Sequence, residues 1–216
     1  MGISIINNRL VFSVLLGALL AIAGLPAGAL PGPDGQDKAA REAPPGLLQK
    51  LQQGGYVIYF RHGHTPDMSD TKTRVIGDCA TQRNLDERGR QQAAQIGSAF
   101  GALKIPVGII EASPYCRTID TARLAFGRVQ PTWDLFSLGQ PKNPDDISRH
   151  AIIKTKLSRP PPNGTNTVLV SHNTPIDTLA QEFLFEGEAL IVRPLGPEQG
   201  FEVILKVAPE DWLKIR

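Results

Sequence analysis

The residues best suited to chemistry in this chain lie directly after apolar segments. Each of three apolar runs is followed by an arginine, a histidine or both: Arg61-His62 after 56–60, Arg117 after 107–110, and His172 after 167–170. An arginine keeps its charge and offers a planar fork of donors that suits phosphate. A neutral histidine beside it is able to attack phosphorus and form a covalent phosphohistidine. The grouping indicates phosphate chemistry, whereas Arg61-His62 alone is equally compatible with a strand cap whose arginine faces solvent.

The elements that must position these residues alternate between strand and helix patterns. We expect strands at 56–60, 107–110, 167–171, 189–193 and 201–207, and helices at 46–53, 86–103, 115–126, 145–157 and 174–185. This alternation predicts an α/β fold with three layers, in which helices cover both faces of a mostly parallel central sheet. Because ligands bind at the carboxyl ends of strands in such sheets, the three groups are expected to converge on one pocket.

Two segments of the chain have neither a helical nor a strand period. The segment 66–83 follows directly on the Arg-His turn, and long loops of this kind in compact domains are usually functional or disordered. We therefore expect it to face a substrate. The segment 130–144 is expected to be irregular, and His150 on the helix after it is assigned to the surface because no partner can be identified for it.

The order of these motifs resembles that of the histidine phosphatase superfamily, the group of phosphoglycerate mutases and acid phosphatases. The resemblance spans about 54–207 and rests on four motifs in the family's order: Arg61-His62-Gly63, Leu85…Gly89…Gln92-Ala93, Ser113-Pro114…Arg117…Thr121-Ala122, and Ser171-His172. A lone Arg-His-Gly is a weak signal, but all four in order are specific. The resemblance implies a phosphoglycerate mutase-like fold and a phosphomonoesterase.

The resemblance also implies a role for each site residue. His62 is the nucleophile that becomes phosphorylated, while Arg61, Arg117 and His172 surround the non-bridging oxygens and stabilise the transition state. The expected substrate-binding residues are those around this set: Gly63, which keeps the turn tight, His64 at the pocket rim, Thr65, and Asn173 through its amide. No metal and no cofactor is required, because the two arginines supply the positive charge.

One departure from the family pattern concerns the general acid. Many members carry a glutamate shortly after the second-arginine helix, and Ser137 stands at that place here. Asp134 is the first candidate for a substitute, with Asp145, Asp146 and Glu188 as others. Without the acid, the enzyme is expected to prefer leaving groups that need no proton, such as phenols, anhydrides and phosphohistidine.

Two other functions remain open at this stage. The spacing His62-x-His64-x-x-Asp67 has the look of a metal site that His172 completes, which predicts a zinc-dependent hydrolase. Arg61 beside a ligand histidine would repel the cation, however. Because the acid is missing, a second alternative is a non-catalytic protein that binds phosphate on the same fold. The retained Arg-His, Arg and His set argues against this alternative.

Composition limits the partners. The chain has 216 residues, 41% of them hydrophobic, and a net charge of +2, which suits one domain with a real core. It has no lysine-arginine run and no aromatic-basic interleaving, so nucleic acid is disfavoured. We expect a small phosphorylated substrate; the sequence does not determine the oligomeric state.

The N-terminus has the features of an export signal. Arg9 precedes an apolar run over 10–25, and Ala27-Gly28-Ala29 fits a small-x-small cleavage site. We therefore expect a signal peptide at 1–29, a flexible leader at 30–45 and a single domain at 46–216. The mature protein is expected to be periplasmic or secreted, with no stable membrane insertion after cleavage, and retention as an uncleaved anchor is the alternative.

Export bears on the oxidation state of the two cysteines. In an oxidising compartment an even count favours a disulfide, here between Cys79 and Cys116, over two buried thiols. Because Cys116 precedes Arg117, the bridge is expected to pin the loop 67–82 to the turn of the second arginine. It would stabilise the fold by about 4 kcal/mol in the chain-entropy account.

Overall fold

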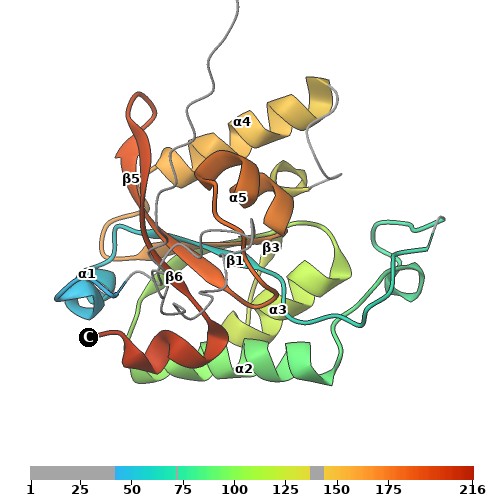
Figure 1. Cartoon of the computed structure of the whole chain (residues 1–216), viewed down its shortest axis with the longest axis horizontal. Helices are drawn as coiled ribbons and strands as arrows, with labels where there is room; N and C mark the ends of the chain where they lie inside the picture. Colours follow the sequence, from blue (N-terminus) through green and yellow to red (C-terminus); the bar gives the residue numbers. More distant parts are fainter. Residues whose placement is uncertain (1–41, 72, 137–143) are drawn as a thin grey trace, which may run out of the picture. The chain divides into compact units, whose positions relative to one another are not determined.

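A computed structural model describes residues 42–71, 73–136 and 144–216, with the side chains of 144–146 excepted (Figure 1). Its centre is a six-stranded sheet in the order β3-β2-β4-β1-β5-β6. The strands are β1 Val57–Arg61, β2 Val107–Ala112, β3 Gln130–Pro131, β4 Asn166–Ser171, β5 Ala189–Gly196 and β6 Gly200–Val207. The first four strands of that order are parallel, and the hairpin β5–β6 adds two antiparallel strands. The predicted α/β class with a mostly parallel sheet is confirmed.

Alternating side chains of the strands feed two cores, one on each face of the sheet. In β1, Ile58 and Phe60 enter one core, and Val57 and Tyr59 enter the other. The first core is covered by α1 Leu47–Gln53, α2 Glu87–Ala102, α3 Cys116–Phe126 and the 3-10 helix η3 Pro209–Lys214. The second is covered by α4 Pro144–Ser158, α5 Asn173–Ala180 and the 3-10 helix η2 Trp133–Leu135 (Figure 1). These are the three predicted layers.

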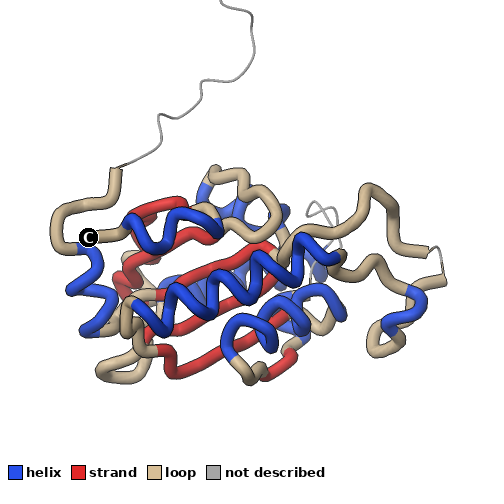
Figure 2. The backbone as a smooth tube through the Cα atoms, turned by 90° about the horizontal axis from the view of Figure 1, so that it is seen from below, coloured by secondary structure: helices blue, strands red, loops and turns tan. Residues whose placement is uncertain are grey.

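Helix α2 illustrates how the sequence builds these elements. The side chain of Asp86 caps it by accepting from the Gly89 amide at 2.9 Å, which satisfies one of the free donors of the first turn. One face of the helix, which carries Gly89, Ala93, Ile96 and Phe100, is buried. Figure 2 shows α2 lying along the sheet, with the segment between β1 and α2 extending past its beginning.

Three sequence predictions need correction. The helix expected over 174–185 ends at Ala180, because Gln181 takes a left-handed conformation with φ 54°. Part of the segment expected to be irregular forms β3 and η2. His150 is buried, not on the surface, because it lies on the same face of α4 as the core residues Ile153 and Leu157.

The expected signal peptide, most of the leader and Ser137 lie outside the described residues. Among the helices that are described, none has the length and apolar character needed to cross a membrane.

Candidate active site

The three groups of chemical residues meet at one edge of the sheet. Strands β2, β4 and β1 are neighbours and run parallel, so their carboxyl ends lie side by side. The ladder continues one residue past the strands, where the amide of His62 donates to the Ser171 carbonyl at 3.0 Å and the amide of Ser113 donates to the Val170 carbonyl at 2.9 Å. The backbone around the site is therefore fixed by the sheet itself.

His62 is the most enclosed of these side chains, with 2% of its surface exposed. Its Nδ1 lies 2.8 Å from the Gly63 carbonyl oxygen. A carbonyl only accepts, so Nδ1 carries the proton and Nε2 carries the lone pair. Burial lowers the pKa of His62 well below its ordinary value, and the positive charges of Arg117 and Arg61 act in the same direction. The imidazole is therefore held neutral, with Nε2 as a nucleophile.

His172 lies against His62, with 5.5 Å between the ring centroids. Its Nε2 is 3.0 Å from the Ser113 hydroxyl, and its main-chain carbonyl accepts from the Tyr59 hydroxyl at 2.8 Å. Burial is the main cause that lowers its pKa well below the ordinary value, with charge contributions from His62 and Arg117. Two neutral imidazoles thus share the same pocket.

Arg117, in the first turn of α3, is 6% exposed and fixed on one side. Its Nη1 donates to Asp70 Oδ1 at 3.1 Å and to the Arg83 carbonyl at 3.3 Å. The guanidinium also lies over the Tyr115 ring, 4.2 Å from the centroid. Its Nε is buried with no hydrogen-bond partner among the described residues. The fork is therefore oriented by Nη1.

Arg61 is held from the segment that follows α5. Its Nη1 donates to the Leu184 carbonyl at 2.8 Å, and its Nη2 donates to Glu186 Oε1 at 3.3 Å. Glu186 also accepts from the Thr65 hydroxyl at 2.8 Å and the Thr65 amide at 3.1 Å, and its Oε1 is 4.0 Å from Nδ1 of His62. The amide and the hydroxyl of Thr65, which was expected to bind substrate, thus both donate to Glu186. The early end of α5 frees this segment to reach the site.

The sequence prediction did not include Glu186. The residue lies in the short segment between the helix expected over 174–185 and the strand expected over 189–193, and a single glutamate there carries no motif. A carboxylate just before a strand that pairs with β1 was the only signal that pointed toward the site.

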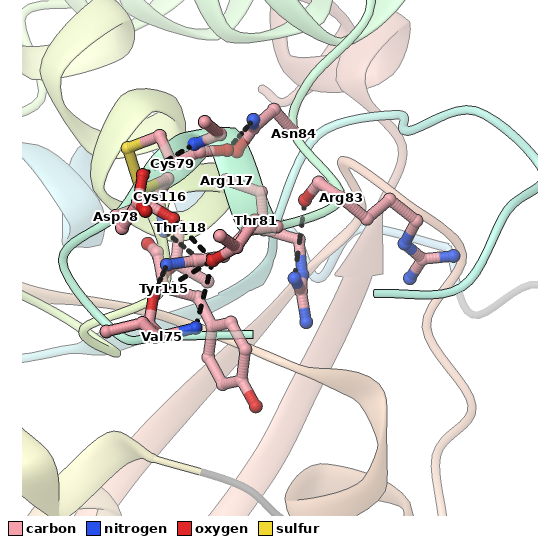
Figure 3. Close-up of a disulfide and its surroundings, with 12 residues drawn as sticks. Val75, Asp78, Cys79, Thr81, Arg83, Asn84, Tyr115, Cys116, Arg117 and Thr118 are labelled. Atoms are coloured by element: carbon pink, nitrogen blue, oxygen red, sulfur yellow. Dashed lines mark hydrogen bonds between the residues drawn. A yellow bond between two sulfur atoms is a disulfide. The ribbon is translucent and has the colours of Figure 1, made fainter. Parts of the chain in front are cut away.

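The loop between β1 and α2 is tied to α3 by the predicted disulfide, which is present between Cys79 and Cys116 (Figure 3). The amide oxygen of Gln82 accepts from the Cys116 amide at 3.0 Å, at the beginning of α3. Asp70 joins the same anchor, because its Oδ1 accepts from both Arg117 and the Arg83 amide. The loop thus positions the second arginine.

Gly63 lies where two backbones touch. A Cβ there would come within 2.8 Å of the Gly89 carbonyl oxygen, and a Cβ on Gly89 would come within 2.1 Å of the His64 carbonyl oxygen. The Gly63 amide donates to the Thr121 hydroxyl at 2.9 Å. Gly63, expected to keep the turn tight, therefore serves the contact between the turn and α2, and its amide is used by Thr121.

Two other expected substrate-binding residues have protein partners. His64 Nδ1 lies 2.6 Å from Asp86 Oδ2, and its side chain is partly exposed. Asn173 accepts from the Leu184 amide at 2.7 Å through Oδ1, so its amide braces the segment that holds Arg61.

Of the four candidate general acids, the two whose side chains are described each have a protein partner. Asp134 pairs with Lys156 at 3.1 Å, and Lys156 also pairs with Glu111 at 2.7 Å. Glu188 accepts from the Phe185 amide at 2.7 Å. The side chains of Asp145 and Asp146 lie outside the described part of the chain. Because its carboxylate is used by Lys156, Asp134 is not supported as the acid.

A pocket of about 500 Å³ opens at this edge of the sheet. Its walls combine residues of the β1 turn, the loop, α2 and the segment after α5: Arg61, His64, Thr65, Pro66, Asp67, Arg83, Arg88, Phe185 and Glu186. Phe185 is 64% exposed, and its ring contacts that of Phe183 at 5.1 Å between centroids. The pocket thus has a cationic and an aromatic wall.

The zinc alternative requires His62, His64 and His172 to point at one centre. Over the described residues, no group of three or more His, Cys, Asp and Glu side chains is arranged to hold a metal ion. The donor set does not fit a zinc site.

Comparisons with known proteins agree with this geometry. Residues 57–135 match the family model of the histidine phosphatase superfamily (branch 1). No curated protein matches the chain by sequence.

Several solved structures share the fold. The protein histidine phosphatase SixA complexed with tungstate is 13% identical, with a TM-score of 0.51 over 72% of this chain and 98% of that one. The mycobacterial glucosyl-3-phosphoglycerate phosphatase in complex with VO3 is 16% identical, with a TM-score of 0.51 over 70% and 98%. Mycobacterial hydrolase 1 is 16% identical, with a TM-score of 0.51 over 72% and 99%.

Proposed function

The chain belongs to the histidine phosphatase superfamily, and from this premise we propose that it hydrolyses phosphomonoesters through a phosphohistidine on His62. One observation carries the proposal. The Gly63 carbonyl holds the proton of His62 on Nδ1 and leaves Nε2 as the nucleophile, in a pocket shared with His172 and two arginines. That chemistry needs a neutral imidazole at ordinary pH, and burial supplies it.

The reaction proceeds in two steps. Nε2 of His62 attacks phosphorus as the bond to the leaving oxygen breaks, and the electron pair of that bond departs with the oxygen. The guanidinium groups of Arg61 and Arg117 stabilise the charge on the non-bridging oxygens. Water then attacks the phosphohistidine, which releases inorganic phosphate and restores the free imidazole.

The leaving group is proposed to depart without a strong protein acid. Asp134 is paired with Lys156, and Glu186 lies on the Nδ1 side of His62 with its oxygens used by Arg61 and Thr65. Positioned acids typically contribute about 10²–10⁴-fold for leaving groups that need protonation. Aryl phosphates and anhydrides are therefore the proposed substrates, ahead of alkyl phosphates.

The test uses an aryl phosphate, with and without EDTA. We expect His62→Ala to lower kcat/KM by at least about 10³-fold, because the covalent path is lost. His64→Ala, a histidine of the same turn bound to Asp86, is the matched control and should lose less than about tenfold. Wild-type protein quenched in alkali should carry phosphate on a histidine, and EDTA should change nothing. Activity that survives His62→Ala, or that EDTA abolishes and zinc restores, contradicts the proposal.

We also propose that the protein is exported to an oxidising compartment. The disulfide between Cys79 and Cys116 supports this location, since such bonds persist there. Mass spectrometry of the protein recovered from an expressing cell should give a chain that begins at Leu30. Recovery of the protein from the cytosol with residues 1–29 still attached would contradict the proposed export.

A further inference from the structure

The pocket lined by Arg61 carries two further arginines, and neither Arg117 nor His62 is among its lining residues. Arg61 and Arg117 serve the transferred phosphate in the proposed function, yet Arg83 and Arg88 also line the pocket beside Arg61. Neither was singled out by the sequence, because Arg83 closes the irregular loop and Arg88 lies in the first turn of α2.

The backbone of Arg83 is fixed directly beside Arg117. Its amide donates to Asp70 at 2.7 Å, and its carbonyl accepts from Nη1 of Arg117 at 3.3 Å. Its side chain extends away from the disulfide (Figure 3), and Nε is buried with no hydrogen-bond partner among the described residues. The charge of Arg83 also contributes to the lowered pKa of His62 and of His172, which agrees with a position close to both imidazoles.

The charges of Arg83 and Arg88 are not neutralised by the protein around them. The pocket wall contains two carboxylates, and Glu186 is already paired with Arg61. Asp67 forms no ion pair within 4.0 Å with any arginine of the described chain, and neither do Arg83 and Arg88 with any carboxylate there. Two guanidinium groups without counterions in one pocket wall attract an anion.

We propose that Arg83 and Arg88 form a second anion subsite, so that the substrate carries a second anionic group, a phosphate or a carboxylate, on its leaving group. The inference rests on the proposed function for the transferred phosphate. The exposed ring of Phe185 in the same pocket gives the linking portion of the substrate an apolar wall. The two anions thus bind on different arginines: the transferred phosphate at Arg61 and Arg117, and the second anion at Arg83 and Arg88.

A matched pair of substrates tests the subsite. 4-Carboxyphenyl phosphate carries the second anion, and 4-carbamoylphenyl phosphate replaces it with a neutral amide of similar shape. We expect the ratio of their kcat/KM values to favour the carboxylate, to fall about tenfold in Arg83→Gln and in Arg88→Gln, and to fall further in the double variant. The intrinsic difference between the two leaving groups cancels when the ratio is compared among variants.

Arg123→Gln is the control variant, because Arg123 is exposed on α3 and is not among the pocket residues. It makes the same change in net charge and should keep the wild-type ratio. Thermal unfolding of each variant verifies the fold. A ratio that stays at the wild-type value in the double variant excludes a subsite for carboxylate, whatever the absolute rates.

A binding measurement separates this inference from the proposed function. Calorimetric titration of His62→Ala with pyrophosphate and with inorganic phosphate requires no turnover. We expect pyrophosphate to bind more tightly than phosphate, and the additional substitution of Arg83 and Arg88 by Gln to remove at least tenfold of that preference. Loss of preference in both assays supports the subsite for phosphate and carboxylate alike, and loss with pyrophosphate alone limits it to phosphate. An unchanged preference in both assays overturns the subsite, while a wild-type protein that turns over neither aryl phosphate contradicts the proposed function itself.

Discussion

The two halves of the candidate active site are built by different means. His62 and His172 follow strands, and the sheet ladder continues through the His62 amide to the Ser171 carbonyl. Arg117 instead depends on the loop between β1 and α2, whose Asp70 side chain and Arg83 carbonyl both bind its Nη1. We call these the sheet half and the loop half.

The difference shows where a fold needs added restraint. Main-chain hydrogen bonds between parallel strands hold the backbone of the sheet half, and side-chain bonds such as that from the Tyr59 hydroxyl to the His172 carbonyl add to them. The loop half has little regular structure, so its order rests on a few long-range side-chain bonds and the Cys79–Cys116 bridge. A covalent bond within the loop half compensates for the absence of a ladder there.

The disulfide gives the largest expected effect. Replacing Cys79 and Cys116 by serine should lower the free energy of unfolding by about 4 kcal/mol, because the unfolded chain regains the entropy of a loop closed over 37 residues. Urea unfolding of the variant, and of the wild type with and without reductant, measures the difference. Limited proteolysis should cut the variant first within the loop half. A urea midpoint that is the same in the variant and in the wild type would show that the disulfide does not supply the restraint assigned to it in the loop half.

His172→Ala tests the sheet half through activity. We expect kcat/KM for an aryl phosphate to fall about 10²–10³-fold, the usual loss when one preorganised group around a developing charge is removed. The urea midpoint serves as the control for folding. If kcat/KM falls less in His172→Ala than in the variant with both cysteines replaced by serine, the sheet half contributes less to activity than the loop half.

The two imidazoles also make the sheet half sensitive to acid. The pKa of both His62 and His172 is lowered in the fold, so each is neutral when folded and takes up a proton on unfolding below its ordinary value near pH 6.5. The unfolded state then binds more protons, and stability falls as the pH drops below about 6.5, by up to about 1.4 kcal/mol per pH unit for each histidine. Urea unfolding across pH 4.5–7.5 measures the slope, and His172→Asn should remove its own share. A slope unchanged in His172→Asn contradicts the assignment.

Asp70→Asn tests a single bond of the loop half, the one between Asp70 and Arg117. The amide keeps a hydrogen-bond acceptor for Nη1 of Arg117 but loses the charge, and we expect kcat/KM to fall about tenfold through misorientation of the guanidinium. Asp78→Asn, in the same loop and capping the 3-10 helix η1 Cys79–Thr81, is the matched control. Equal losses in the two variants would mean that loop order, and not the Asp70–Arg117 bond, is responsible.

The sheet half was largely predictable from the sequence. Apolar runs identify β1, β2 and β4, and parallel topology brings the residues after them to one edge. The disulfide followed from an even cysteine count in a chain expected to be exported. Those inferences depend on local periodicity and on a count of two, both of which a sequence displays directly.

The loop half and its partners were not predictable in the same way. Asp70, Arg83 and Glu186 reach the site from irregular segments, and no period or motif reports which way their side chains turn. The pairing of Asp134 with Lys156 was not predictable either, since it depends on where η2 meets α4. Such contacts depend on three-dimensional packing that a single sequence does not encode locally.

The contact between Gly63 and Gly89 has a consequence for protein design. Each position excludes even a methyl group, because the β1 turn and the first turn of α2 touch through main-chain atoms. The Arg61-His62-Gly63 turn is therefore not a portable motif on its own. A designer who grafts it onto another scaffold must also provide a neighbouring helix that lets the two backbones approach this closely.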